Sequence, residues 1–307
     1  MKRIKSTFSI KNLENLSGIK AHTLRIWEKR YNLLEPERTY TNIRRYSLES
    51  LKRLLNVTLL YNHGFKISKI ASLNEDEMPE LVRSIALKSN SEQVAINAFK
   101  LAMINFDYDL FDTNYNEILQ HHDFKFVFLN VFMPLMRELG ILWQTGAISP
   151  AHEHFITNLI KQKIHLQTEV LQKKKPQRID HPLFVIFLPE NEIHELGVLY
   201  LNYLILSSGY RTIFLGQSLQ TSSLETLYSY NSKFYFVSYL TVEPNKEEIM
   251  PFLKHFYSSL LENRDSRLLI FGPQQIEIDT DNLPPQIELF RSVESFIAKY
   301  LEEIVFV

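Results

Sequence analysis

The chain has 307 residues, of which 45% are hydrophobic and 22% are charged, a composition typical of a globular protein with two or three domains. It contains no cysteine, which excludes a disulfide framework and a thiolate metal site. No apolar run approaches the roughly 20 residues that span a bilayer, and the first residues turn polar too early for a secretory signal. We therefore expect a cytoplasmic location and no membrane partner.

Charge is distributed unevenly along the chain. Residues 1–72 contain 15 lysines and arginines and five acidic residues, a net charge of +10, whereas the whole chain has a net charge of −1. A basic segment on an acidic body is typical of a polyanion-binding module joined to another function. A solvated basic face is the alternative that charge alone leaves open.

The basic segment has the pattern of a winged helix-turn-helix. Ser9 can cap a helix that stops at Gly18, and a second helix is expected over residues 21–30 with Leu24 and Trp27 on its apolar face. Residues 35–46 have the pattern of a short hairpin. A long amphipathic helix capped by Ser47 and one more short helix over 68–73 follow.

Three parts of this segment, TLRIWEKRY at 23–31, RRYS at 44–47 and GFKISKI at 64–70, together resemble the MerR family of transcription regulators. The resemblance implies a winged helix-turn-helix domain over residues 1–75 that binds double-stranded operator DNA. It places Thr23, Arg25 and Lys29 on the recognition helix, within reach of bases and phosphates in the major groove. It assigns phosphate contacts to residues of the wing, namely Arg38, Arg44, Arg45 and Tyr46.

Residues 76–175 are expected to form a helical bundle, because amphipathic patterns follow one another there without a convincing strand run. Helices are expected from near residues 81, 92 and 110, from 124 to 139 with a kink at Pro134, and from 150 to about 172. Trp143, Glu153 and His154 lie in this region. Taken alone, they indicate ordinary core packing and a surface pair near a helix start.

Strand and helix patterns alternate in residues 180–307, which predicts a Rossmann-like, doubly wound parallel sheet. The fold class is thus multi-domain, α followed by α/β. Strands are expected over residues 183–188, 210–215, 234–240 and 267–271, and helices over 198–208, 220–230, 247–263 and 292–303. Ligands of such sheets bind beyond the carboxyl ends of the strands, and the loop after the first strand contains His194.

That loop reads EIHELG at 192–197 and resembles the cobalamin-binding signature Asp-x-His-x-x-Gly, with Glu192 in place of the aspartate. The resemblance implies that His194 is the metal ligand, holding cobalt from below in place of the cofactor's own benzimidazole, and that Glu192 orients the imidazole. Gly197 would allow close approach to the nucleotide tail, which slides in beside the sheet. Further cofactor-binding residues implied are Ser238, Leu240 and Gly272; Pro273 stands where a second glycine is expected.

The bundle contributes a third motif, Trp-x9-Glu-His, formed by Trp143, Glu153 and His154. With the other two motifs it resembles the light-responsive, cobalamin-dependent repressors of carotenoid genes. The resemblance implies adenosylcobalamin, with methylcobalamin as the other form, clamped between bundle and sheet with Trp143 over its upper ligand. It also implies homo-oligomers, dimers or tetramers, whose operator binding is released when light cleaves the cobalt–carbon bond.

Two other functions stay open at this stage. Glu192 and Pro273 depart from the signature, and a MerR-type regulator with a degenerate cobalamin pocket, switched by a protein partner, would fit them. A cobalamin-carrying module of a mutase or methyltransferase needs a separate substrate domain, for which no residues are left. The chain is therefore expected not to be an enzyme.

Overall fold

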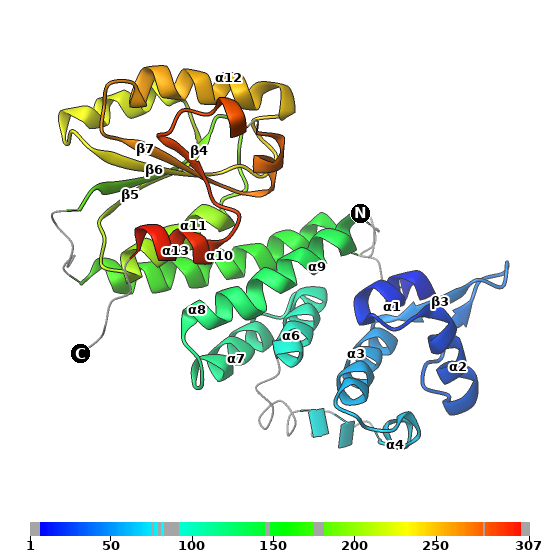
Figure 1. Ribbon diagram of the computed structural model, residues 1–307. Coiled ribbons are helices and arrows are strands. Elements are labelled where there is room, and N and C mark those ends of the chain that lie inside the picture. The colour runs from blue at the N-terminus through cyan, green and yellow to red at the C-terminus, as the bar shows by residue number, and fades with distance from the viewer. Residues whose placement is uncertain are drawn as a thin grey trace. The chain divides into compact units, whose positions relative to one another are not determined.

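The computed structural model describes residues 7–74, 77–78, 81–82, 92–144, 148–174, 181–278 and 280–301 (Figure 1). The chain divides into two compact units, Met1–Ile160 and Lys161–Val307. The division into three domains at residue 75 and at residues 175–180 stays a prediction. No helix within the described ranges is long and apolar enough to cross a membrane.

The first unit begins with the predicted helix-turn-helix. Helix α1 spans Ile10–Ser17, and α2 spans Ala21–Tyr31. The Ser9 hydroxyl accepts the Asn12 N–H at 3.1 Å while the Asn12 side chain accepts the Ser9 N–H at 3.0 Å, so two N–H groups that the helix cannot pair are satisfied. Gly18 ends α1 with φ 75°, a conformation that costs glycine little.

The wing and the helices after it complete the DNA-binding region. Strand β2 (Glu37–Arg38) pairs antiparallel with β3 (Arg44–Ser47), which pairs on its other side with β1 (Thr7–Phe8). Strand β1 was not predicted, because two residues are too few to show an alternating pattern. The helices that follow are α3 (Leu48–Asn62) and α4 (Ile67–Ala71).

The predicted bundle is confirmed. It comprises α6 (Glu92–Asn105), α7 (Tyr108–Leu119), α8 (Phe124–Phe126) with the π-helical segment η1 (Val127–Phe132), α9 (Met133–Gln144) and α10 (Pro150–Gln172). Phe99 packs against Phe111 and Phe132, with ring centroids 4.9 and 5.3 Å apart. The π-helical segment ends two residues before Pro134, whose missing N–H interrupts the regular hydrogen-bond ladder where a kink was predicted. The helix expected from residue 81 lies largely outside the described residues.

The second unit is a parallel five-stranded sheet in the order β5-β4-β6-β7-β8. Its strands are β4 (Leu183–Pro189), β5 (Thr212–Leu219), β6 (Phe234–Tyr239), β7 (Arg267–Phe271) and β8 (Ile287–Leu289). The doubly wound architecture is confirmed, and helices cover both faces (Figure 1). Strand β8 was missed because three residues after two prolines show too little pattern for a strand.

The two faces of the sheet bury separate apolar clusters. Helix α12 (Lys246–Phe256), continued by η3 (Tyr257–Leu261), packs on one face with Ile249 and Leu253. Helices α11 (Leu196–Ser207) and α13 (Val293–Tyr300) pack on the other. The predicted helix over 220–230 is instead the 3-10 segment η2 (Thr221–Ser229), which buries only two of its residues, so little apolar contact stabilises a regular α-helix there. The short 3-10 turns η4 (Pro273–Glu277) and η5 (Thr280–Asn282) precede β8.

Candidate functional site

Helix α2 separates its apolar and polar residues onto two faces. Leu24 and Trp27 are buried, and the Trp27 ring meets the Tyr61 ring edge-on at 5.1 Å, so both are core residues as expected. Arg25 and Lys29 are exposed, and Thr23 is half-buried. Arginine and lysine four positions apart share one face of a helix, which is the arrangement that a groove-reading helix requires.

The wing is joined to α2 through Glu28, which the sequence analysis did not single out. Its carboxylate accepts the Arg44 Nε–H at 3.0 Å and the Tyr46 hydroxyl at 2.9 Å. Tyr46 is fully buried, and burial, followed by the hydrogen bond to Glu28, raises the pKa of its hydroxyl. Arg44 and Tyr46 therefore fix the wing to α2, and their contact with phosphate stays a prediction.

The other two wing arginines are differently placed. Arg38 is exposed, and its Nη1 donates to the Asn42 side chain at 2.6 Å across the hairpin turn. Arg45 is half-buried, and no hydrogen bond or ion pair of its side chain is found among the described residues. Among the described residues, the Arg45 guanidinium would therefore not have to break a contact within the protein in order to bind a phosphate.

At the start of α10 the predicted imidazole is exposed and the predicted acid is half-buried. The Glu153 carboxylate accepts the Thr157 hydroxyl at 2.8 Å and lies 3.4 Å from Nε2 of His154, whose side chain is 73% exposed. The neighbouring His152 is the buried one. Its ring stacks on Phe106 at 4.7 Å, and burial lowers its pKa.

His152 was missed because its role is local: its Nδ1 accepts the Ser149 N–H at 3.2 Å at the helix start. A serine three residues before a histidine is the only sequence signal that could have indicated it. Trp143 lies in the last turn of α9, and the described part of the chain includes its backbone but not its side chain.

The loop after β4 holds the predicted metal ligand. Oε1 of Glu192 lies 2.6 Å from Nδ1 of His194 and accepts the N–H groups of Ile193 and His194, each at 2.9 Å. Glu192 is fully buried, whereas the His194 side chain is 53% exposed. The longer acid therefore orients the imidazole as the resemblance implies for an aspartate.

The second oxygen of Glu192 binds a different loop. Oε2 accepts three consecutive backbone N–H groups after β6, from Thr241, Val242 and Glu243, at 3.0, 2.7 and 2.9 Å. Burial alone would raise the pKa of Glu192, but these N–H groups and His194 outweigh burial and lower the pKa to about 2. An ionised carboxylate has no proton to donate, so Nδ1 of His194 carries the hydrogen, and Nε2 is the nitrogen whose lone pair a neutral imidazole would offer to a metal.

The remaining predicted cofactor residues surround the carboxyl end of β6. Ser238 is fully buried, and its Oγ has no hydrogen-bond partner among the described residues. Leu240 is buried. A Cβ added to Gly197 would lie 2.6 Å from the Tyr239 ring, and one added to Gly272, at φ 102°, would lie 2.2 Å from the Leu240 carbonyl oxygen. Both glycines are therefore required by close packing within the protein itself.

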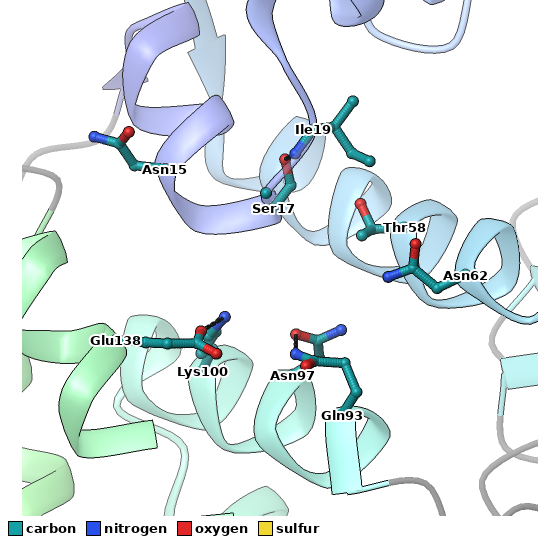
Figure 2. A pocket seen from close by; sticks show the side chains of 10 residues that line it. Asn15, Ser17, Ile19, Thr58, Asn62, Gln93, Asn97, Lys100 and Glu138 are labelled. Atoms are coloured by element: carbon teal, nitrogen blue, oxygen red, sulfur yellow. Dashed lines mark hydrogen bonds and ion pairs between the residues drawn. The ribbon is translucent and has the colours of Figure 1, made fainter. Parts of the chain in front are cut away.

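A polar cavity lies apart from these residues, within the first unit. It has a volume of about 350 Å³ and lies between α1 and α3 on one side and α6 and α9 on the other (Figure 2). Asn15, Ser17, Thr58, Asn62, Gln93, Asn97, Lys100 and Glu138 are among its lining residues. Lys100 is buried and forms an ion pair with Glu138. Helices of the DNA-binding region and of the bundle thus meet across polar side chains.

Two family models match the chain. Residues 8–76 match the MerR HTH family regulatory protein, and residues 95–166 match the B12 binding domain. The chain joins a MerR module to a B12-binding module. The B12-binding match falls on α6 to α10, the bundle that contains Trp143, Glu153 and His154.

Two curated relatives are similar to the chain over about seven tenths of its length. The HTH-type transcriptional repressor CarH of Myxococcus xanthus is 26% identical over 224 residues, which cover 71% of this chain and 73% of CarH. The HTH-type transcriptional repressor CarA of the same organism is 25% identical over 225 residues, 71% of each chain. The chain, which joins a MerR module to a B12-binding module, is therefore homologous to these two transcriptional repressors.

A solved structure with the same fold is the monomethylamine corrinoid protein of Methanosarcina barkeri. It has 12% sequence identity and a TM-score of 0.54, and it covers 67% of this chain and 96% of its own. At this low sequence identity, the similarity shows a shared fold and nothing about function.

Proposed function

We propose that the protein is a transcription regulator, a repressor, whose binding to operator DNA is controlled by cobalamin. The single observation that carries the cofactor assignment is the Glu192–His194 pair, because it fixes the imidazole tautomer that leaves Nε2 for cobalt. The MerR module supplies the exposed Arg25 and Lys29 on α2. The proposal treats the protein as a regulator and not as an enzyme.

The chemistry of the donor set fits a corrinoid. Because the corrin ring itself supplies four nitrogen ligands to cobalt, one imidazole is a sufficient protein ligand, and among the described residues no three His, Asp or Glu side chains form a site for a free metal ion. The buried Ser238 Oγ lacks a hydrogen-bond partner in the described structure, which is costly unless a bound group supplies one. When bound, adenosylcobalamin would supply a light-sensitive cobalt–carbon bond.

The protein's own residues have separate tasks in this proposal. Glu192 would hold His194 for the cobalt, and Trp143, Glu153 and His154 are proposed as further cofactor-binding residues. The polar cavity beside Lys100 suits a signal between the B12-binding and MerR modules, since an interface lined by polar groups shifts at smaller cost than a packed apolar one. Homo-oligomers that bind DNA in the dark and dissociate in light complete the proposal.

The test is a titration of the purified chain with adenosylcobalamin, followed by absorbance and by size-exclusion chromatography in darkness and after green light. We expect a bound spectrum that differs from free cofactor, a larger species in darkness, and a smaller one after light. His194→Ala is expected to lose the spectral change, and His181→Ala, another histidine of the same unit, to keep it. A wild-type protein that stays colourless would favour the regulator with a degenerate pocket and a protein partner.

A further inference from the structure

The crevice where a ligand enters this sheet is defined by the strand order. The chain passes from β4 to β5 on one side and then to β6 on the other side of β4. At such a switch point the two connections leave on opposite faces, and a crevice opens between the loops at the carboxyl ends of β4 and β6. The first of these loops contains His194, and the second begins at Leu240.

Two contacts join the sides of this crevice. The Glu192 carboxylate, from the loop after β4, accepts the three N–H groups of residues 241–243 in the loop after β6. Tyr239, the last residue of β6, places its ring against Gly197 in the first turn of α11. The crevice is thus held together by hydrogen bonds at one point and occupied by an aromatic ring at another.

The Tyr239 ring lies so close to α11 that position 197 has room only for glycine. Three of its ring carbons lie 2.6 to 2.8 Å from where a Cβ would stand, and real side chains do not approach so closely. Residues alternate between the faces of a strand, so Tyr239 packs with the α11 cluster while Phe236 belongs to the α12 cluster. The ring therefore lies against the start of α11, next to the loop with His194 and on the α11 side of the position where the strand order predicts the crevice.

We infer that Tyr239 is a specificity residue that closes the crevice to the nucleotide tail of a corrinoid. This inference rests on the proposed cobalamin function. Cobalamin must give up its own base before His194 can bind cobalt, and burial of the displaced tail in a pocket would offset that cost. Because the Tyr239 ring blocks the tail, burial of the tail cannot compensate for the cost of displacing the base. Cobinamide, the corrinoid that lacks the nucleotide, has no base to give up and binds at least as tightly.

The experiment compares aquacobalamin and aquacobinamide in absorbance titrations of the full chain, for wild type, Tyr239→Ala and Tyr239→Phe. The quantity measured is the cobalamin-to-cobinamide affinity ratio. We expect a ratio of one or less for wild type and for Tyr239→Phe, which keeps the ring. Tyr239→Ala opens the crevice, and we expect its ratio to rise at least tenfold. Circular dichroism checks that each variant is folded, and His194→Ala checks that binding is axial.

The possible results separate the inference from the proposed function. If wild type binds both corrinoids through His194 but prefers cobalamin, or if Tyr239→Ala changes the ratio less than tenfold, the inference is overturned and the function stands. If Tyr239→Ala does not fold, the wild-type ratio decides alone. If neither corrinoid binds to wild type or to Tyr239→Ala, both the function and the inference fail. If wild type binds only cobinamide through His194 and Tyr239→Ala also binds cobalamin, the inference stands, and the proposed cofactor becomes a corrinoid without the nucleotide tail.

Discussion

Glu28 of the recognition helix and Arg44 of the wing strand form an ion pair, with 3.0 Å between Oε1 and Nε. The same carboxylate accepts the hydroxyl of the buried Tyr46. One acidic residue in a basic segment therefore connects the two parts of the MerR module that are predicted to contact DNA. The relative position of helix and wing depends on this side chain.

Glu28→Ala is expected to destabilise the MerR module. The Tyr46 hydroxyl would stay buried without its acceptor, which costs about 1–3 kcal/mol. Urea unfolding measures the loss. Glu49→Ala is the matched control, because the Glu49 side chain is 78% exposed and its ion pair among the described residues is with Lys52, a type of contact worth about 0.5 kcal/mol or less. Equal losses in the two variants would contradict the role given to Glu28.

Arg45→Ala is expected to weaken DNA binding to the same extent for all sequences. A phosphate contact carries no sequence information, and losing one reduces the slope of log affinity against log salt by about one. Fluorescence anisotropy at several salt concentrations measures this. Lys173→Ala, which removes an exposed cation immediately after α10 that pairs with Glu169, is expected to leave the slope unchanged. An unchanged slope for Arg45→Ala would remove this residue from the wing contacts.

The sequence predicted the helices and strands whose hydrophobic periodicity extends over many residues. It also predicted the site residues that lie close together in the chain. The two DNA-binding helices, the bundle and four of the sheet strands follow from periodicity over many residues. Strands β1 and β8, with two and three residues, depend on partners distant in sequence. Periodicity shows which face of a helix or strand is apolar, but it does not show which other element packs against that face.

In the candidate sites, too, local motifs were predicted and contacts between segments distant in sequence were not. The motif around His194 was visible because its residues are consecutive, and Glu192 lies where the signature puts an acid. The reach of Glu192 to residues 241–243 depends on the side-by-side packing of β4 and β6, which no local pattern contains. The same holds for the Tyr239 ring against Gly197 and for Glu28 beneath the wing.

The buried ion pair at the polar cavity is expected to respond asymmetrically to removal of its partners. The Lys100 side chain is 5% exposed, whereas that of Glu138 is 37% exposed. Glu138→Ala leaves an ammonium group buried without its partner and should cost about 2 kcal/mol, reduced because water reaches this side of the pair. Lys100→Met leaves a carboxylate that water can solvate and should cost about 1 kcal/mol or less. Urea unfolding of both variants measures the difference, and the reverse order would contradict it.

His152 predicts a loss of stability in mild acid. Its folded pKa is lowered by burial, so the unfolded chain takes up a proton first as the pH falls below the ordinary value of 6.5. The free energy of unfolding is therefore expected to fall from pH 7 to pH 5. Protonated Nδ1 also cannot accept the Ser149 N–H at the start of α10. His152→Gln should reduce this pH dependence, while His255→Gln, a change at an exposed position of α12 in the second unit, should keep it.

Glu192 predicts a second, more acidic loss of stability. Its pKa is lowered from 4.5 to about 2, so its contribution is complete above pH 4.5 and is lost as the pH falls through about 2. A difference of this size corresponds to about 3 kcal/mol. Glu192→Gln should be less stable at pH 7, because an amide nitrogen would face backbone N–H donors, and its stability should fall less between pH 5 and pH 2. Unfolding by urea across this range measures the difference from wild type. The exposed Glu225→Gln is expected to follow the wild-type curve, and a Glu192→Gln curve parallel to wild type would show that this carboxylate does not stabilise the two loops.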